Sequence, residues 1–118
     1  MKGGKIIDRL EKIRQWLQIN KDSSLEIKKE EDGHLDTAVL KLQAVNLVPY
    51  RDRDHYLPAQ SLILKGRGTI STDFGPKPLP YPSYEIALTD TFSVQEEAGT
   101  LKICTERGRY TFKVQNRD

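Results

Sequence analysis

The segment 25-LEIKKEEDGHLDTAVL-40 predicts a β-hairpin, and the rest of the fold can be built outward from it. The Asp-Gly dipeptide at 32–33 is favoured in a two-residue type I′ turn. Counting outward from this turn places apolar residues opposite apolar residues on one side of the hairpin. The facing pairs are Leu25 with Leu40, Ile27 with Ala38, and the oppositely charged Lys29 with Asp36. Because turn chemistry and apolar pattern give the same register, we expect this hairpin to form.

Two strands continue from the hairpin. The second half of the hairpin belongs to a strand over 35–48, and the apolar alternation changes phase after Ala44, which predicts a β-bulge or sharp bend there. The next strand covers 61–71. On its apolar face Gly66 and Gly68 leave bare backbone, and we expect another part of the molecule to pack closely against it.

The middle of the chain is rich in proline. The segment 75-GPKPLPYPS-83 has a proline at every second position from 76 to 82, which predicts a stiff, polyproline-like connection. A strand over 84–94 follows, with a kink at Asp90, and 95–99 reads as an acidic turn.

A second hairpin closes the chain, with strands over 100–106 and 109–115 around Arg107-Gly108. A two-residue turn gives a register that again separates an apolar face from a polar one. The facing pairs are then Glu106 with Arg109, Thr105 with Tyr110, Ile103 with Phe112, and Leu101 with Val114. Arginine disfavours positive φ, so we expect a type I turn with Gly108 in the left-handed conformation.

Residues 5–19 predict one amphipathic helix. A narrow apolar stripe runs along it at spacings of four, three and four residues, and Ile7 and Trp16 flank the stripe. The stripe consists of Ile6, Leu10, Ile13 and Leu17. We expect it to pack on the core of the same domain, with a dimer or partner interface as the alternative.

Together these elements predict an α+β fold. An antiparallel sheet with one apolar face must bury that face. We therefore expect the N-terminal helix to pack on a strongly bent antiparallel sheet, or on a partly open small β-barrel, of about six strands. The expected strands cover 24–30, 35–48, 61–71, 84–94, 100–106 and 109–115, and residues 1–118 are expected to form a single domain.

Composition narrows the class of protein. The formal net charge of +2 gives no strong argument for a nucleic-acid or membrane partner. Cys104 is the only cysteine, so an intramolecular disulfide is impossible and a reducing, cytoplasmic location is expected. The sequence has no run of about 18 apolar residues that could span a membrane.

The segment 49-PYRDRDHY-56 holds the residues best suited to binding. Tyrosine and arginine are favoured interface anchors, whereas four consecutive charges cannot be buried without partners. We therefore expect an exposed connection that serves as a structural or recognition loop. The candidate binding residues are Tyr50, Arg51, Arg53, His55 and Tyr56.

Catalysis receives less support from the sequence. Asp52, Asp54 and His55 are metal-ligand types, and a metal-assisted hydrolase centred on them is one alternative. However, a catalytic site uses about three protein ligands in fixed geometry, and each carboxylate here has cations beside it. Cys104 has one lysine two residues away, which is weak activation for a nucleophile. We expect no cofactor, no metal and no catalytic residue.

Two non-enzymatic classes of function rank ahead of the hydrolase. The first is a non-enzymatic, cytosolic protein-interaction or regulatory module, which acts on a protein partner or self-associates. The second is a nucleic-acid-binding small β domain for single strands or RNA, because exposed aromatics and cations serve that role in small barrels. Its candidate residues are Tyr50, Tyr56, Tyr81, Tyr84, Arg51, Arg53, Lys65, Arg67, Arg107 and Arg109. The small net charge and the acidic residues near the fourth strand favour the first class.

Overall fold

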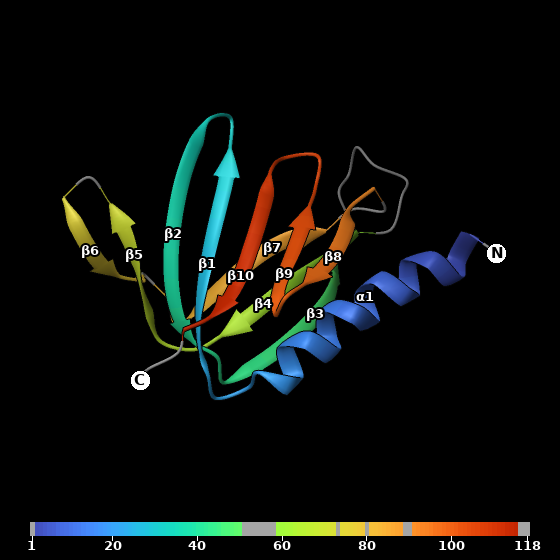
Figure 1. Cartoon of the computed structure of the whole chain (residues 1–118), viewed down its shortest axis with the longest axis horizontal. Coiled ribbons are helices and arrows are strands. Elements are labelled where there is room, and N and C mark those ends of the chain that lie inside the picture. The colour runs from blue at the N-terminus through green and yellow to red at the C-terminus, as the bar shows by residue number, and fades with distance from the viewer. Residues whose placement is uncertain (1, 51–58, 73, 80, 89–90, 116–118) are drawn as a thin grey trace.

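The computed structural model describes residues 2–50, 59–72, 74–79, 81–88 and 91–115 (Figure 1). These residues form one helix and ten strands in the order α1 (Lys2–Ile19), β1 (Ser24–Glu31), β2 (His34–Lys41), β3 (Ala44–Tyr50), β4 (Ala59–Lys65), β5 (Gly68–Thr72), β6 (Gly75–Pro78), β7 (Ser83–Leu88), β8 (Ser93–Glu97), β9 (Thr100–Cys104) and β10 (Arg109–Val114).

The strands form two antiparallel sheets that cross each other (Figure 1). The large sheet has the strand order β6-β5-β2-β1-β10-β9-β8, and the small sheet has the order β3-β4-β7. Helix α1 lies along the side formed by β8 and β3 (Figure 1). The expected α+β fold with a helix packed on a strongly bent sheet is confirmed, and the described strands do not close into a barrel.

The first hairpin is confirmed in turn and register. Asp32 and Gly33 both have positive φ, at 51° and 80°, as a type I′ turn requires. Strands β1 and β2 pair as predicted, with Leu25 opposite Leu40 and Ile27 opposite Ala38. Local turn chemistry and burial of one face therefore agree in this part of the chain.

The expected single strands over 35–48 and 61–71 are each divided into two strands, because the two segments bend together between the sheets. The first runs from β2 of the large sheet into β3 of the small one, with its bend at 42–43 close to the predicted bend, and the second runs from β4 of the small sheet into β5 of the large one. Hydrogen bonds continue around the bend, where the Gln43 N–H donates to the Lys65 carbonyl at 2.8 Å. A Cβ on Gly66 would lie 1.8 Å from the Lys41 carbonyl oxygen, so only glycine allows this approach. The bare backbone at Gly66 and Gly68 does accept close packing, and the neighbour is the backbone of the adjacent strand.

The prediction of a polyproline-like connection in the proline-rich segment is wrong for its first half. Gly75–Pro78 forms strand β6, which pairs with β5 at the edge of the large sheet. Prolines are tolerated there because an edge strand needs hydrogen-bond donors on one side only.

The expected strand over 84–94 is divided between the sheets. Strand β7 belongs to the small sheet and β8 to the large one. The expected acidic turn at 95–99 is mostly strand, since β8 runs to Glu97 and the turn to β9 is formed by Ala98 and Gly99 at φ 52° and 79°.

In the second hairpin the predicted register is wrong by two residues. Ile103 lies opposite Tyr110 and Leu101 opposite Phe112, so the apolar face is preserved. The Thr105 hydroxyl accepts hydrogen bonds from the N–H groups of Arg107 and Gly108, at 3.1 and 3.2 Å, and widens the turn. Gly108 is not left-handed; a Cβ there would lie 2.4 Å from the Glu30 carbonyl oxygen of β1.

Helix α1 contributes part of the core. Ile13, Leu17 and Trp16 are buried and Leu10 is partly buried, which confirms most of the predicted stripe. The side chain of Ile6 lies outside the described part of the structure. These residues pack with the inner faces of both sheets, where the buried members include Leu25, Ile27, Leu40, Leu62, Leu64, Ile86, Leu101, Ile103 and Phe112.

Arg9 connects the helix to Phe92, the residue directly before β8. Its guanidinium lies 4.7 Å from the centre of the Phe92 ring and donates a hydrogen bond to the Phe92 carbonyl. The Phe92 ring is itself buried. Among the described residues, no helix is both long and apolar enough to cross a membrane.

Candidate functional site

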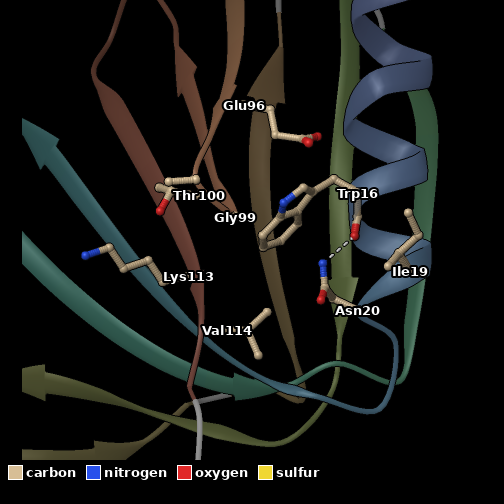
Figure 2. Close-up of a pocket in the computed structure, with 9 residues that line it drawn as sticks. Trp16, Ile19, Asn20, Glu96, Gly99, Thr100, Lys113 and Val114 are labelled. Carbon is tan, nitrogen blue, oxygen red and sulfur yellow. Dashed lines mark hydrogen bonds between the residues drawn. The ribbon is translucent and has the colours of Figure 1, made fainter.

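An open groove lies where the end of α1 meets the β8–β9 turn and the end of β10 (Figure 2). Its volume is about 810 Å³. The lining residues come from three separate parts of the sequence: Trp16, Ile19, Asn20, Glu96, Ala98, Gly99, Thr100, Lys113 and Val114. We call this feature the Trp16 groove.

The indole of Trp16 forms the floor of the groove. It points from the helix towards the strands in Figure 2, and its ring meets Phe112 edge to face, with centroids 6.3 Å apart. The helix end beside it is closed by Asn20, whose side-chain amide donates to the Trp16 carbonyl at 2.8 Å. The floor is therefore apolar and anchored in the core, and we expect it to keep its shape when a ligand binds.

The rim of the groove combines an exposed apolar side chain with charges of both signs. Ile19, the last residue of α1, is 82% exposed, and it differs from the other exposed apolar residues in lining this groove. Glu96 lies beside the Trp16 indole, whereas the side chain of Lys113 leaves the end of β10 and points away from the indole (Figure 2). A smaller hollow of about 440 Å³ on the neighbouring helix face shares Trp16, Ile19 and Glu96 with the groove. Ile19 thus projects between two hollows.

A polar cluster lies at the opposite end of the core. Lys29 lies opposite Tyr110 on one side and Asp36 on the other, and Tyr84 of the small sheet interacts electrostatically with Tyr110 and Asp36. The hydrogen bond to Glu31, with Nζ 3.1 Å from Oε2, raises the pKa of Lys29.

Burial raises the pKa of both tyrosine hydroxyls in this cluster, and that of Tyr84 rises well above its usual range. Neutral phenols and an ion-paired lysine form a stable polar boundary to the core. A catalytic base needs a pKa near the working pH, and raised tyrosine pKa values lie far from it.

Comparison with known proteins shows the family. The family model of YmzB-like protein matches residues 7–117, from the first turns of α1 to beyond β10. The chain belongs to the YmzB-like family. It is 36% identical over 110 residues to the "Uncharacterized protein YmzB" of Bacillus subtilis (strain 168), covering 88% of this chain and 93% of that protein. No solved structure matches.

The predicted binding loop of this YmzB-like chain lies almost entirely outside the described residues. Tyr50 is the last residue of β3 and pairs with Ala59 of β4, so the intervening segment joins two paired strands. The side chain of Tyr50 and all of Arg51, Arg53, His55 and Tyr56 lie outside the described residues.

The same holds for Asp52 and Asp54, so the metal-site alternative stays a hypothesis. In the described part of the chain, no three His, Cys, Asp or Glu side chains lie together as metal ligands would. Cys104, a half-buried free thiol, lies opposite Arg109 at the end of β9.

The described residues of the nucleic-acid alternative do not form one stripe. Tyr84 is half-buried between the sheets, whereas Tyr81 is exposed. Lys65 and Arg67 flank the bend at Gly66, and Arg109 lies on the outer face of the large sheet.

Sequence reasoning missed the Trp16 groove. Its lining unites residues 16–20, 96–100 and 113–114, which only the tertiary fold brings together. The available signal was the position of Trp16 beside the helix stripe and of Ile19 outside it, two large apolar residues beyond what a narrow stripe needs.

Proposed function

We propose that this YmzB-like protein is a non-enzymatic protein-interaction module that binds through the Trp16 groove, and that its partner is a second copy of the chain. The observation that carries the proposal is the exposed Ile19 next to a hollow with an apolar floor. Apolar projections beside hollows are typical of protein interfaces.

Self-association is supported by the composition of the groove itself. In a two-fold dimer the same patch faces itself, so a projection must fit a hollow on the same surface. Ile19 supplies the projection, and Trp16 with Val114 supplies an apolar hollow beside it. Rotation about a two-fold axis can therefore bury Ile19 of each copy against the indole of the other.

The rim charges are complementary under the same rotation. Glu96 and Lys113 carry opposite charges at different sides of the hollow. A two-fold axis near the edge of the groove lets the long, exposed side chain of Lys113 turn towards Glu96 of the other copy, which adds electrostatic complementarity to the apolar contact. A partner of one charge sign would leave one of these rim residues unmatched.

The experiment is analytical ultracentrifugation of the purified protein over a concentration series. We expect a monomer–dimer equilibrium. Reversing one charge, Glu96→Lys or Lys113→Glu, weakens the dimer because like charges then meet, and the double exchange restores it. A monomer at every concentration contradicts the proposal, as does a dimer that none of these variants affects.

A further inference from the structure

The outer face of the large sheet carries a cluster of cations around one threonine. In β10, Thr111 lies opposite Lys28 of β1 and opposite Lys102 of β9. Two residues before it along the same strand is Arg109, and two residues after it is Lys113. Since strand neighbours at i±2 share a face, all four cations lie on the same face as Thr111. We call these five residues the cation frame.

This face points away from the core. The alternate residues of β10, Tyr110 and Phe112, are buried, so the odd-numbered ones face outward. All four cations of the frame are exposed, and Thr111 at the centre is half-buried. The long cationic side chains can therefore bend over the threonine hydroxyl and surround it.

The register gives the size of the frame. Adjacent strands lie about 4.8 Å apart, so Lys28 and Lys102 are separated by roughly 10 Å at their Cα atoms. Arg109 and Lys113 are four residues apart on one strand, which corresponds to about 13 Å. These spacings exceed what one carboxylate can contact at once, so the frame suits an anion that carries several charges in a row.

The frame keeps an excess of positive charge. Two carboxylates border it on the β1 side, with Glu26 opposite Lys113 and Glu30 opposite Arg109. The Lys28 Nζ lies 3.8 Å from Glu26 Oε1. On the β9 side, the residues that face Lys102 and Arg109 are the uncharged Gln95 and Cys104, and Glu97 adds a third carboxylate two residues beyond Gln95 on the same face. Lys28 and Lys102 both lie opposite the uncharged Thr111, so no carboxylate stands between these two cations at the centre of the frame.

We propose that the cation frame binds the phosphate groups of a polyanionic ligand. Arginine binds phosphate through two parallel N–H donors, and lysine adds point charges. A threonine hydroxyl at the centre supplies one more donor. The residues that border the frame are Glu26, Glu30, Thr37, Gln95, Glu97, Thr100 and Cys104. None of them is aromatic, so the site recognises phosphate charge and has no platform for stacking bases.

Two probes distinguish the source of the phosphates: inorganic tripolyphosphate and a single-stranded oligouridine. Binding is measured by calorimetry and by fluorescence polarisation, respectively, at about 50 mM salt, where phosphate contacts are strong. We expect binding of at least one probe, and binding of the RNA alone identifies a nucleic-acid backbone as the ligand. For the RNA, four phosphate contacts give a slope of log affinity against log salt of about −3.

The decisive variant is Lys102→Gln with Arg109→Gln. It should weaken binding at least tenfold and, for the RNA, halve the salt slope to about −1.5. The matched control is Arg14→Gln with Lys21→Gln, which removes one arginine and one lysine from exposed positions outside the frame. We expect the control to change affinity less than about threefold.

Two results would overturn the proposal: neither probe binds the wild-type protein, or both double variants weaken binding equally. Thermal melting of each variant checks that it folds. The cation frame and the Trp16 groove share Lys113, and the variants leave this residue unchanged. Ultracentrifugation of the Lys102→Gln, Arg109→Gln protein should therefore give the wild-type monomer–dimer equilibrium whether or not phosphate binding is lost.

Discussion

Replacing Ile19 by serine should abolish most of the dimer while leaving the monomer folded. Burying an isoleucine side chain contributes about 1.5–3 kcal/mol. Because 82% of the residue is exposed in the monomer, about 1.2–2.5 kcal/mol remains to be gained on association. In a two-fold dimer the same contact forms twice, so the two Ile19 side chains together contribute about 2.5–5 kcal/mol to the free energy of association. The dissociation constant of the dimer should rise roughly 60-fold to a few thousand-fold.

Sedimentation equilibrium measures this change directly, with circular dichroism as the check on folding. The melting temperature at low protein concentration should stay close to that of the wild type, since exposed substitutions usually shift stability by no more than about 0.5 kcal/mol. The control is Leu35→Ser, because Leu35 is also an exposed apolar residue, at 62%, on strand β2. An unchanged dimer in Ile19→Ser, or an equal loss in Leu35→Ser, refutes the assignment of the interface.

Three further predictions concern the fold. Gly66→Ala should destabilise the protein by several kcal/mol, because its Cβ would collide with the Lys41 carbonyl; urea denaturation measures the loss, and a neutral result means that the bend is not tight. Leu17→Ala should cost about 2–5 kcal/mol, since the side chain is fully buried, and a cost near zero would place the helix elsewhere. Burial raises the pKa of Tyr84 above its unfolded value, so the stability from the neutral phenol is present below pH ~10 and is lost above it; Tyr84→Phe should reduce this alkaline loss, measured as unfolding free energy against pH.

The first hairpin could be predicted because two independent signals coincide there. The Asp32-Gly33 turn and the apolar alternation define the same register, so an error in one would have appeared as a conflict with the other. The helix was predictable for a similar reason: its apolar period of 3.6 residues is sustained over several turns.

The passage of strands between the two sheets was only partly predictable from periodicity. The change of phase after Ala44 predicted a bend close to the one at 42–43, whereas 61–71 keeps its alternation through the bend and looks continuous in sequence. The glycine at 66 marks the place, but its meaning depends on the carbonyl of Lys41 on the neighbouring strand.

The register of the second hairpin depends on one side chain. A two-residue turn at Arg107-Gly108 fits the apolar pattern, yet the hydroxyl of Thr105 captures two backbone N–H groups and lengthens the turn. A shift of two residues keeps the same faces, so the apolar pattern could not detect it. Both candidate binding surfaces likewise depend on which strands become neighbours, which local patterns leave open.

Quenching of tryptophan fluorescence by acrylamide tests the central claim most directly. Trp16 is the only tryptophan of the chain and lines both the groove and the smaller hollow beside it, so its emission reports on this region of the surface. If a second copy covers the groove, the quenching constant should fall as protein concentration rises, in step with the mass measured by light scattering. A quenching constant that stays the same while the mass doubles would contradict the proposal, because the copies would then associate through another face.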